Sequence, residues 1–187
     1  MSARLRFVVT DIAGVKVVDR LRLEDDRGYL ERLYCVEEMA TAGWQAPVAQ
    51  INHTFTRSLG TVRGMHFQHP PHAETKLVIC LRGEVFDVAL DLRAGSPTLL
   101  HWHGEVLSAS NGRALLVPQG VAHGFQTLSD DVEMLYLHTS TYVPAAEDGV
   151  HPADPLPAIA WPLAIADMSV RDRAHPPLPV GYKGLPL

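Results

Sequence analysis

Cysteine is almost absent from this 187-residue chain, which holds only Cys35 and Cys80. Two cysteines in a chain of this size do not form a disulfide framework, and Cys80 lies in an apolar segment where we expect a small buried side chain. Long hydrophobic runs are also missing, because no run approaches the ~18 residues that a membrane span needs. The N-terminal apolar stretch is broken by Asp11 and shows no secretory signal. These absences predict a cytoplasmic protein that does not contact a membrane.

Positive charge is scarce as well. The chain has 16 lysines and arginines against 21 aspartates and glutamates, which gives a net charge of −5. This balance argues against a general nucleic-acid binder or a protein of anionic membrane surfaces, since both need net positive charge. Only Lys16, Lys76 and Lys183 are lysines. In a chain that prefers arginine, a lysine next to the core indicates a task that a guanidinium does not suit.

Turn residues and period-two patterns are abundant. The chain has 14 glycines and 14 prolines, and 47% of its residues are hydrophobic. Residues 85–92 alternate between an apolar and a mixed face, as a half-buried strand does. Many short strands with little helix predict an all-β antiparallel sandwich or barrel, and a jelly roll has room for a ligand between its sheets. We expect one domain over residues 1–187 that ends in a proline-rich tail from about residue 175 to 187.

Two hairpins are predicted from two-residue turns. Arg82-Gly83 is expected to join strands at 76–81 and 85–92. Asn111-Gly112, the strongest short hairpin signal, is expected to join strands at 105–110 and 113–117. Further strands are expected over residues 125–128 and from 132 to about 142, and helices over 36–42 and in a short turn after Ser169.

The densest polar cluster is Arg63-Gly64-Met65-His66-Phe67-Gln68, with Lys76 ten residues after His66. Lys76 opens an apolar strand, so its ammonium group emerges from a strand end next to the core. It is either a solvated strand-end lysine or a compact positive charge with a chemical task. His66 is either a hydrogen-bonded core histidine or a functional one.

A second cluster is Pro118-Gln119-Gly120-Val121-Ala122-His123-Gly124-Phe125. Together with His66 it is similar to the two-motif pattern of the cupins, a jelly-roll superfamily. Metal-binding cupins carry a His-x-His pair where this chain has His66-Phe67-Gln68, and glutamine is a poor ligand for a catalytic transition metal. A metal site made of His66, Glu74 and His123 remains an alternative. The pair His101 and His103 is expected at the surface.

Two further residues allow a structural and a chemical interpretation. Tyr136 shares a strand face with His138 and Tyr142, and it is either a buried tyrosine with a satisfied hydroxyl group or a proton donor. Periodicity does not separate Tyr136 from Tyr142 in that role. Asp172 follows Ser169 with capping-box spacing, so it either caps a helical turn or orients an imidazole as the third member of a catalytic triad does.

Taken together, these motifs resemble the dTDP-4-dehydrorhamnose 3,5-epimerase family over most of the chain. The motifs that carry the resemblance occur in one order: Asp26-Arg27-Gly28, Gln50-x-Asn52-His53, Arg63 to Gln68, Lys76-Leu77-Val78, Gly83-x-Val85-Phe86-Asp87-Val88, Asp91-Leu92-Arg93, Ser96-Pro97-Thr98, Leu107-Ser108-Ala109, Pro118 to Phe125, Tyr142-x-Pro144, Asp154-Pro155, Ile159-x-Trp161-Pro162 and Ser169-x-x-Asp172. The resemblance implies a cupin jelly roll that needs no metal and no cofactor.

The resemblance also implies roles for individual residues. His66 matches the catalytic base, Asp172 its carboxylate partner, Lys76 the group beside the keto oxygen, and Tyr136 the acid on the other face of the sugar ring. Residues that match the nucleotide- and sugar-binding positions are Arg27, Gln50, Asn52, Arg63, His123, Glu147 and Arg171. The implied reaction is inversion at C3, C5 or both of a nucleotide-diphospho-4-keto-6-deoxysugar, for which a thymidine-diphosphate sugar is expected. A homodimer that exchanges N-terminal strands is also implied, with Arg27 reaching the partner's site.

The chain departs from the family pattern near its N-terminus. Arg32 stands where most members carry a glutamate after Arg27-Gly28, so the sugar or the base that is bound can differ. Three alternatives stay open: a single-site 3- or 5-epimerase of another nucleotide sugar, a metal-dependent cupin oxygenase or isomerase, and a non-catalytic sugar-nucleotide binder.

Overall fold

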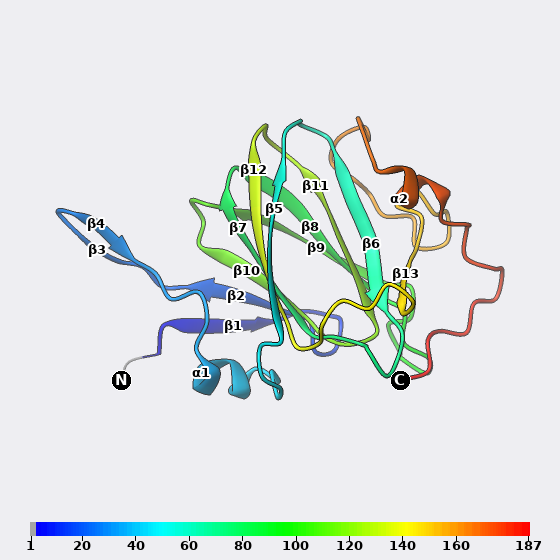
Figure 1. Ribbon diagram of the computed structural model, residues 1–187, viewed down its shortest axis with the longest axis horizontal. Helices are drawn as coiled ribbons and strands as arrows, with labels where there is room; N and C mark the ends of the chain where they lie inside the picture. Colours follow the sequence, from blue (N-terminus) through cyan, green and yellow to red (C-terminus); the bar gives the residue numbers. More distant parts are fainter. Residues whose placement is uncertain (1–2) are drawn as a thin grey trace.

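Two antiparallel β-sheets lie face to face in the computed structural model, which describes residues 3–187 (Figure 1). The six-stranded sheet has the order β1 (Leu5–Val9), β2 (Lys16–Arg20), β10 (Arg113–Val117), β7 (Lys76–Arg82), β12 (Val132–His138) and β5 (Gln50–Thr56). The five-stranded sheet has the order β13 (Glu147–Gly149), β6 (Val62–Gln68), β11 (Val121–Thr127), β8 (Glu84–Asp91) and β9 (Trp102–Ser108). The all-β jelly-roll prediction is confirmed.

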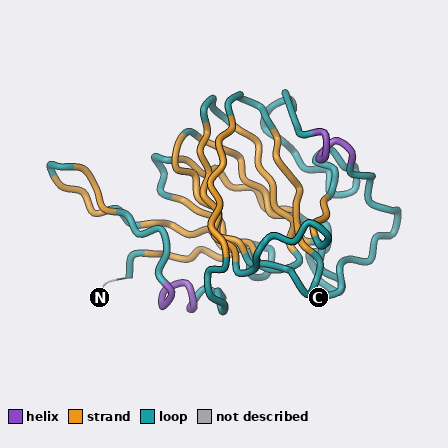
Figure 2. Tube along the Cα trace, in the orientation of Figure 1, coloured by secondary structure: helices purple, strands orange, loops and turns teal. Residues whose placement is uncertain are grey.

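Helices are few and short, as predicted. Helix α1 (Val36–Thr41) lies on the outer face of the six-stranded sheet, where Met39 packs in one apolar cluster with Trp44 and Leu116. Helix α2 (Val170–Ala174) begins after Ser169 and lies beside the five-stranded sheet (Figure 2). No helix within residues 3–187 has the length and apolar character to cross a membrane.

Both predicted hairpins are wrong, because the strands on either side of each turn belong to different sheets. Strand β7 pairs with β10 and β12, whereas β8 pairs with β9 and β11. From β5 to β8, and again from β9 to β13, each strand lies in the sheet opposite to its predecessor. Such crossings between facing sheets are how a jelly roll encloses a space between them.

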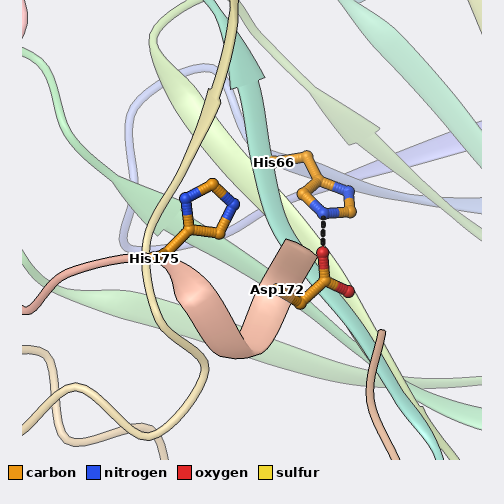
Figure 3. Close-up of side chains that lie close together, drawn as sticks. All are labelled: His66, Asp172 and His175. Carbon is orange, nitrogen blue, oxygen red and sulfur yellow. Dashed lines mark hydrogen bonds and ion pairs between the residues drawn. The ribbon is translucent and has the colours of Figure 1, made fainter. Parts of the chain in front are cut away.

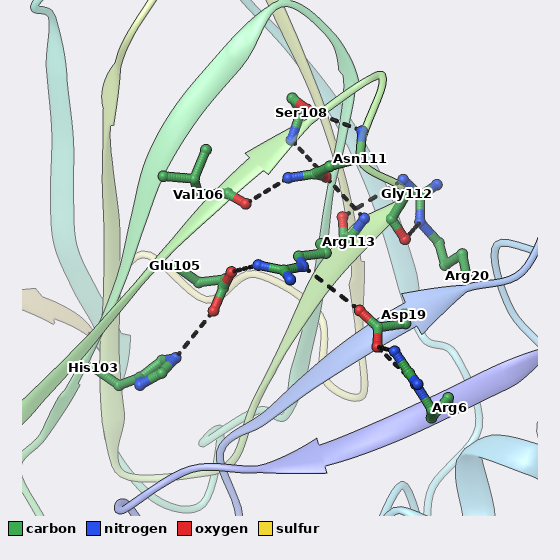
Figure 4. Close-up of polar contacts among 10 residues, drawn as sticks. All are labelled: Arg6, Asp19, Arg20, His103, Glu105, Val106, Ser108, Asn111, Gly112 and Arg113. Atoms are coloured by element: carbon green, nitrogen blue, oxygen red, sulfur yellow. Dashed lines mark hydrogen bonds and ion pairs between the residues drawn. The ribbon is translucent and has the colours of Figure 1, made fainter.

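The Asn111-Gly112 turn is closed by a side chain instead of by strand pairing. The side-chain oxygen Oδ1 of Asn111 accepts hydrogen bonds from the backbone N–H groups of Ser108 and Arg113 (Figure 4). The side-chain nitrogen Nδ2 of Asn111 donates to the Val106 backbone carbonyl. The turn can therefore direct the chain from one sheet to the other without a ladder between β9 and β10.

A series of ion pairs connects β1, β2 and β10 of the six-stranded sheet to β9 of the five-stranded sheet. Arg6 pairs with Asp19 at 2.6 Å, Arg113 lies 3.6 Å from Asp19 and 2.6 Å from Glu105, and His103 lies 3.7 Å from Glu105 (Figure 4). His103 is half-buried at the end of this series of ion pairs, so its expected place at the surface is wrong. His101 is exposed, as expected.

Strand β8 is buried on both faces. Its apolar face, with Val88 and Leu90, packs under the C-terminal part of the chain, where Trp161 and Leu185 cover the five-stranded sheet from outside. The mixed face points between the sheets and carries Asp87, which is fully buried. Because the C-terminal residues cover the apolar face of β8, the face that carries Asp87 is the one that lies between the two sheets.

A small hairpin of β3 (Leu23–Asp25) and β4 (Gly28–Leu30) projects away from the sandwich (Figure 1). Its six strand residues are all exposed. The turn of this hairpin carries Arg27, whose side chain is 89% exposed.

Candidate active site

A cavity of about 660 Å³ opens between the two sheets. It is lined by ten of the eleven predicted site residues: Gln50, Asn52, Arg63, His66, Lys76, His123, Tyr136, Glu147, Arg171 and Asp172. The remaining one, Arg27, lies on the projecting hairpin outside this cavity. Residues from six different strands and from α2 thus meet at one place.

Strand register explains how these side chains meet. On the five-stranded sheet His66 of β6 lies opposite His123 of β11. On the six-stranded sheet Tyr136 of β12 lies opposite Asn52 of β5. Residues directly opposite each other on antiparallel strands point to the same face, so each pair faces the cavity.

Two glycines let β6 and β11 approach each other beside the histidines. A Cβ atom on Gly64 would lie 2.5 Å from the Gly124 Cα atom, and one on Gly124 would lie 2.7 Å from the Arg63 carbonyl oxygen. Backbone φ at Gly64 is +140°, a conformation that other residues rarely adopt. The Arg63-Gly64 and His123-Gly124 motifs therefore need glycine for the close packing of these two strands.

A hydrogen-bonded pair of His66 and Asp172 occupies the side of the cavity next to α2 (Figure 3). The His66 Nε2 atom lies 2.7 Å from Asp172 Oδ1, and the Asp172 side chain is 2% exposed. Burial raises the pKa of Asp172, but hydrogen bonds from His66, Ser169 and the Gly64 N–H outweigh burial and hold that pKa below its usual value. Asp172 is therefore an ionised acceptor for the imidazole.

This contact determines the tautomer of His66. A carboxylate can only accept, so Nε2 carries the proton and Nδ1 keeps a free lone pair. The Arg171 guanidinium also lies 3.2 Å from Nε2, but it cannot donate to a nitrogen that is already protonated. The free Nδ1 atom is the one that can take a proton from a bound molecule.

Capping of α2 and orientation of His66 turn out to be separate tasks. The Ser169 side chain accepts a hydrogen bond from the Asp172 backbone N–H and so caps the helix. The Asp172 carboxylate is left free to accept a hydrogen bond from His66, which is the contact that the chemical interpretation of this residue requires.

Lys76 is buried rather than solvated. Its side chain is 9% exposed, and its Nζ atom lies 2.9 Å from Glu74 Oε1 and 3.2 Å from the His66 carbonyl oxygen. Gln68 donates to the other Glu74 oxygen at 2.6 Å. The buried ion pair is compensated by hydrogen bonds, and Glu74 holds the ammonium group at the cavity wall.

Glu74 is consequently not available to the alternative metal site of His66, Glu74 and His123. Within residues 3–187, the group of three possible metal ligands whose ligand atoms all lie within 4.8 Å of one another is His66, Asp172 and His175 (Figure 3). The Arg171 guanidinium lies against this group, 3.6 Å from Asp172 and 3.2 Å from His66. A fixed positive charge there opposes the binding of a cation.

The two candidate tyrosines have different surroundings. Tyr136 is 9% exposed, and its hydroxyl group lies 3.4 Å from Thr54 Oγ1. Burial raises the pKa of Tyr136 strongly, so its hydroxyl stays protonated. Tyr142 is half exposed and donates to Glu147 at 2.6 Å, which also accepts from Arg171. Tyr136 is the one that lies deep between the sheets.

A second histidine–carboxylate pair lines the space between the sheets and was not predicted from the sequence. The His123 Nε2 atom lies 2.8 Å from Asp87 Oδ1, with both side chains buried. Burial raises the pKa of Asp87, and the His123 contact opposes that rise. An acidic residue within the apolar alternation of β8 was the available signal, because such a residue needs a buried partner.

The N-terminal residues lie apart from the cavity. Arg27 pairs with Asp25 at 2.5 Å on the exposed hairpin. Arg32, which stands in the place of a family glutamate, forms an ion pair with Glu38 of α1. The neighbouring Glu31 instead bridges Arg20 at 2.6 Å and Arg22 at 3.0 Å. Within a single chain, none of these groups contacts the cavity.

The chain is similar in sequence to known epimerases of nucleotide sugars. The family model described as dTDP-4-dehydrorhamnose 3,5-epimerase matches residues 9–179. A dTDP-4-dehydrorhamnose 3-epimerase of Streptomyces niveus is 42% identical over 163 residues, which is 87% of this chain and 78% of that protein. A dTDP-4-dehydrorhamnose 3,5-epimerase of Sinorhizobium fredii (strain NBRC 101917 / NGR234) is 38% identical over 181 residues, 95% and 93% of the two chains.

A solved structure is similar as well. It is a dTDP-6-deoxy-D-glucose-3,5-epimerase from Legionella pneumophila Philadelphia 1 in complex with dTDP-4-keto-L-rhamnose, with a TM-score of 0.87, 35% identity and 91% coverage of both chains. With a matching family model over most of its length and relatives of this identity, the chain belongs to the dTDP-4-dehydrorhamnose 3,5-epimerase family.

Proposed function

We propose that this protein is an epimerase that inverts C3, C5 or both of a thymidine-diphospho-4-keto-6-deoxysugar. The observation that carries the proposal is the placement of His66 and Tyr136 on facing sheets across one cavity. A sugar ring between them meets a base on one face and a proton donor on the other. Inversion at carbon requires these two groups on opposite faces.

The first step is removal of a proton from the carbon next to the ketone. The free Nδ1 atom of His66 takes this proton, and Asp172 supports the imidazolium that forms. The C–H electron pair becomes the enolate, whose oxygen carries the negative charge. Lys76, held by Glu74 at 2.9 Å, faces that oxygen as a fixed positive charge.

The second step returns a proton to the same carbon from the opposite face. Tyr136 donates its hydroxyl proton, and the enolate electron pair forms the new C–H bond. Burial keeps this hydroxyl protonated until the step occurs. Substrate and product are isomers, so the sequence involves no net oxidation or reduction. Before a second cycle, His66 releases its proton to solvent and Tyr136 regains one from solvent. Repetition at the second carbon then gives a 3,5-epimerase.

The diphosphate is proposed to bind at the mouth of the cavity, where Arg63 and Arg171 are exposed. Arg171 is anchored by Glu147 at 2.6 Å, and Arg63 by Thr56 at 2.9 Å. A local basic group of this kind attracts an anionic ligand although the chain as a whole carries a net charge of −5. The relative from Legionella pneumophila, which was solved with dTDP-4-keto-L-rhamnose, supports this class of substrate.

Product analysis tests the proposal. The protein is incubated with dTDP-4-keto-6-deoxyglucose, and the configuration at C3 and C5 of the products is determined by NMR. We expect inversion at one or both carbons. Unchanged configuration at both would contradict the proposal. Inversion at C3 alone would match the activity named for the Streptomyces niveus relative.

We also propose that the protein is a homodimer in which the β3–β4 hairpin reaches the partner's cavity and places Arg27 there. The exposure of this hairpin supports the proposal, as does the edge strand β1, where Val9 is 77% exposed and which pairs on one side only with β2. An unpaired edge of this kind is suited to pairing with a second chain.

Subunit complementation tests the dimer. We expect Arg27→Ala and His66→Ala proteins each to be impaired at low substrate concentration, because each site needs both residues. Mixed subunits contain one site with neither change, so refolding an equal mixture should restore about a quarter of the wild-type rate. Activity no higher than the sum of the two separate variants would contradict the exchange of hairpins.

A further inference from the structure

His138 lies at the end of β12, on the cavity face and beside the proposed oxyanion site. In the strand register it is directly opposite Lys76 of β7 on one side and Gln50 of β5 on the other. Cβ atoms of such cross-strand pairs lie about 4.5–5.5 Å apart. The imidazole therefore has the Lys76 side chain as its immediate neighbour in the cavity wall.

The imidazole of His138 is neutral. Burial lowers its pKa to about 4, and the nearby Lys76 ammonium group contributes to this lowering while Glu74 opposes it. A neutral imidazole has one N–H donor and one acceptor nitrogen. A neutral donor can share an oxygen with Lys76 without adding a second positive charge.

A relay of amides decides which nitrogen of His138 carries the proton. The Tyr142 backbone N–H can only donate, and it does so to Gln50 Oε1 at 2.9 Å. The Gln50 amide nitrogen then donates to Asn52 Oδ1 at 3.1 Å. This orients the Asn52 amide nitrogen toward His138 Nε2, at a longer distance of 3.5 Å. Nε2 is thus the acceptor, and Nδ1 carries the proton.

The Nδ1–H group has no hydrogen-bond partner within residues 3–187. It is also not one of the fully buried polar atoms without a partner, so it is accessible. The His138 side chain lines the cavity, and the N–H group is therefore open to the cavity. The ring itself is held in place, because it stacks on Tyr136 with 6.2 Å between ring centroids and 28° between the planes. A free donor on a fixed ring is suited to binding a ligand oxygen.

We propose that the Nδ1–H group of His138 donates a hydrogen bond to the substrate oxygen that Lys76 faces, so that the two residues form a two-donor site for the enolate oxygen. This inference rests on the proposed function. Because the oxygen gains negative charge only as the proton leaves carbon, the hydrogen bond strengthens in the transition state. His138 is then a catalytic residue that acts on kcat more than on KM.

The test compares His138→Leu with His138→Asn. Leucine and asparagine have nearly the same shape, but only asparagine keeps a neutral N–H donor, and its amide nitrogen can take the place of Nδ1. We expect the leucine variant to lose roughly 10- to 100-fold in kcat with KM changed less than about threefold, a smaller loss than removal of a sole oxyanion donor because Lys76 remains. The asparagine variant should be roughly 3- to 10-fold faster than the leucine variant. His101→Ala, at an exposed histidine outside the cavity, serves as the control.

Each outcome bears on the inference. A leucine variant with the wild-type kcat would overturn it, as would leucine and asparagine variants of equal rate. A rise in KM with unchanged kcat would also overturn it, because that pattern belongs to ground-state binding. Failure of the wild-type protein to epimerise any 4-keto sugar would instead reject the proposed function, so the two failures are distinguishable.

Discussion

Replacement of His66 by alanine is expected to lower the epimerisation rate at least about 10³-fold, within the range that general-base catalysis contributes. The Nδ1 atom of His66 is the ring nitrogen that the contact with Asp172 leaves free to accept a proton. Affinity for dTDP should change less than about threefold, since the diphosphate is proposed to contact Arg63 and Arg171 at the mouth. Steady-state kinetics and calorimetric titration with dTDP measure the two quantities.

The Asp172→Asn variant keeps the His66 imidazole but removes the carboxylate that orients it. Asparagine can turn an N–H toward Nε2, which favours the tautomer with the proton on Nδ1 and removes the base. We expect a loss of about 10²- to 10⁴-fold in kcat, as for an exchanged carboxylate in a catalytic triad. An His66→Ala protein with near-normal turnover would contradict the assignment of the base, and an Asp172→Asn protein with near-normal turnover would contradict the role of the tautomer.

Replacement of Lys76 by methionine is the second change with a large expected effect. Methionine keeps the length of the side chain but removes the charge that faces the enolate oxygen. Loss of such a group costs about 10²- to 10³-fold in kcat. The variant also leaves Glu74 buried without its cation, so the free energy of unfolding should fall by about 3 kcal/mol.

The double variant Lys76→Met with Glu74→Gln distinguishes the two effects. A neutral glutamine beside methionine removes the uncompensated charge, so at least half of the lost stability should return. The epimerisation rate should stay low, because the oxyanion site still lacks its ammonium group. Urea unfolding and steady-state kinetics on the same samples measure both. Recovery of the rate together with stability would mean that Lys76 is only a structural residue.

Most residues of the cavity wall that carry polar side chains could be predicted, because their types and their order in the sequence are informative. His66, Lys76, Tyr136 and Asp172 are separated by up to 106 residues, yet the cavity contains all four. Periodicity did not choose between Tyr136 and Tyr142, because a strand from 132 to about 142 would place both on one face, whereas β12 ends at His138. Burial separates them, and burial depends on the facing sheet, which a strand pattern does not describe.

The strand pairing could not be predicted in the same way. Arg82-Gly83 and Asn111-Gly112 have the composition of hairpin turns, but each connects two sheets. A turn motif describes where the chain bends and says nothing of which strand lies beside it. Similarly, the apolar face of β8 packs under the C-terminal chain, so the face with Asp87 lies between the sheets, where Asp87 contacts His123 of the cavity wall.

Solvent deuterium incorporation tests the central claim most directly. The protein is mixed with dTDP-4-keto-6-deoxyglucose in heavy water, and deuterium at C3 and C5 is followed by NMR and mass spectrometry. Proton abstraction by His66 and return of a solvent-derived proton by Tyr136 predict deuterium at each inverted carbon and at no other. Inversion without deuterium, or absence of exchange with every 4-keto nucleotide sugar tried, would contradict the account.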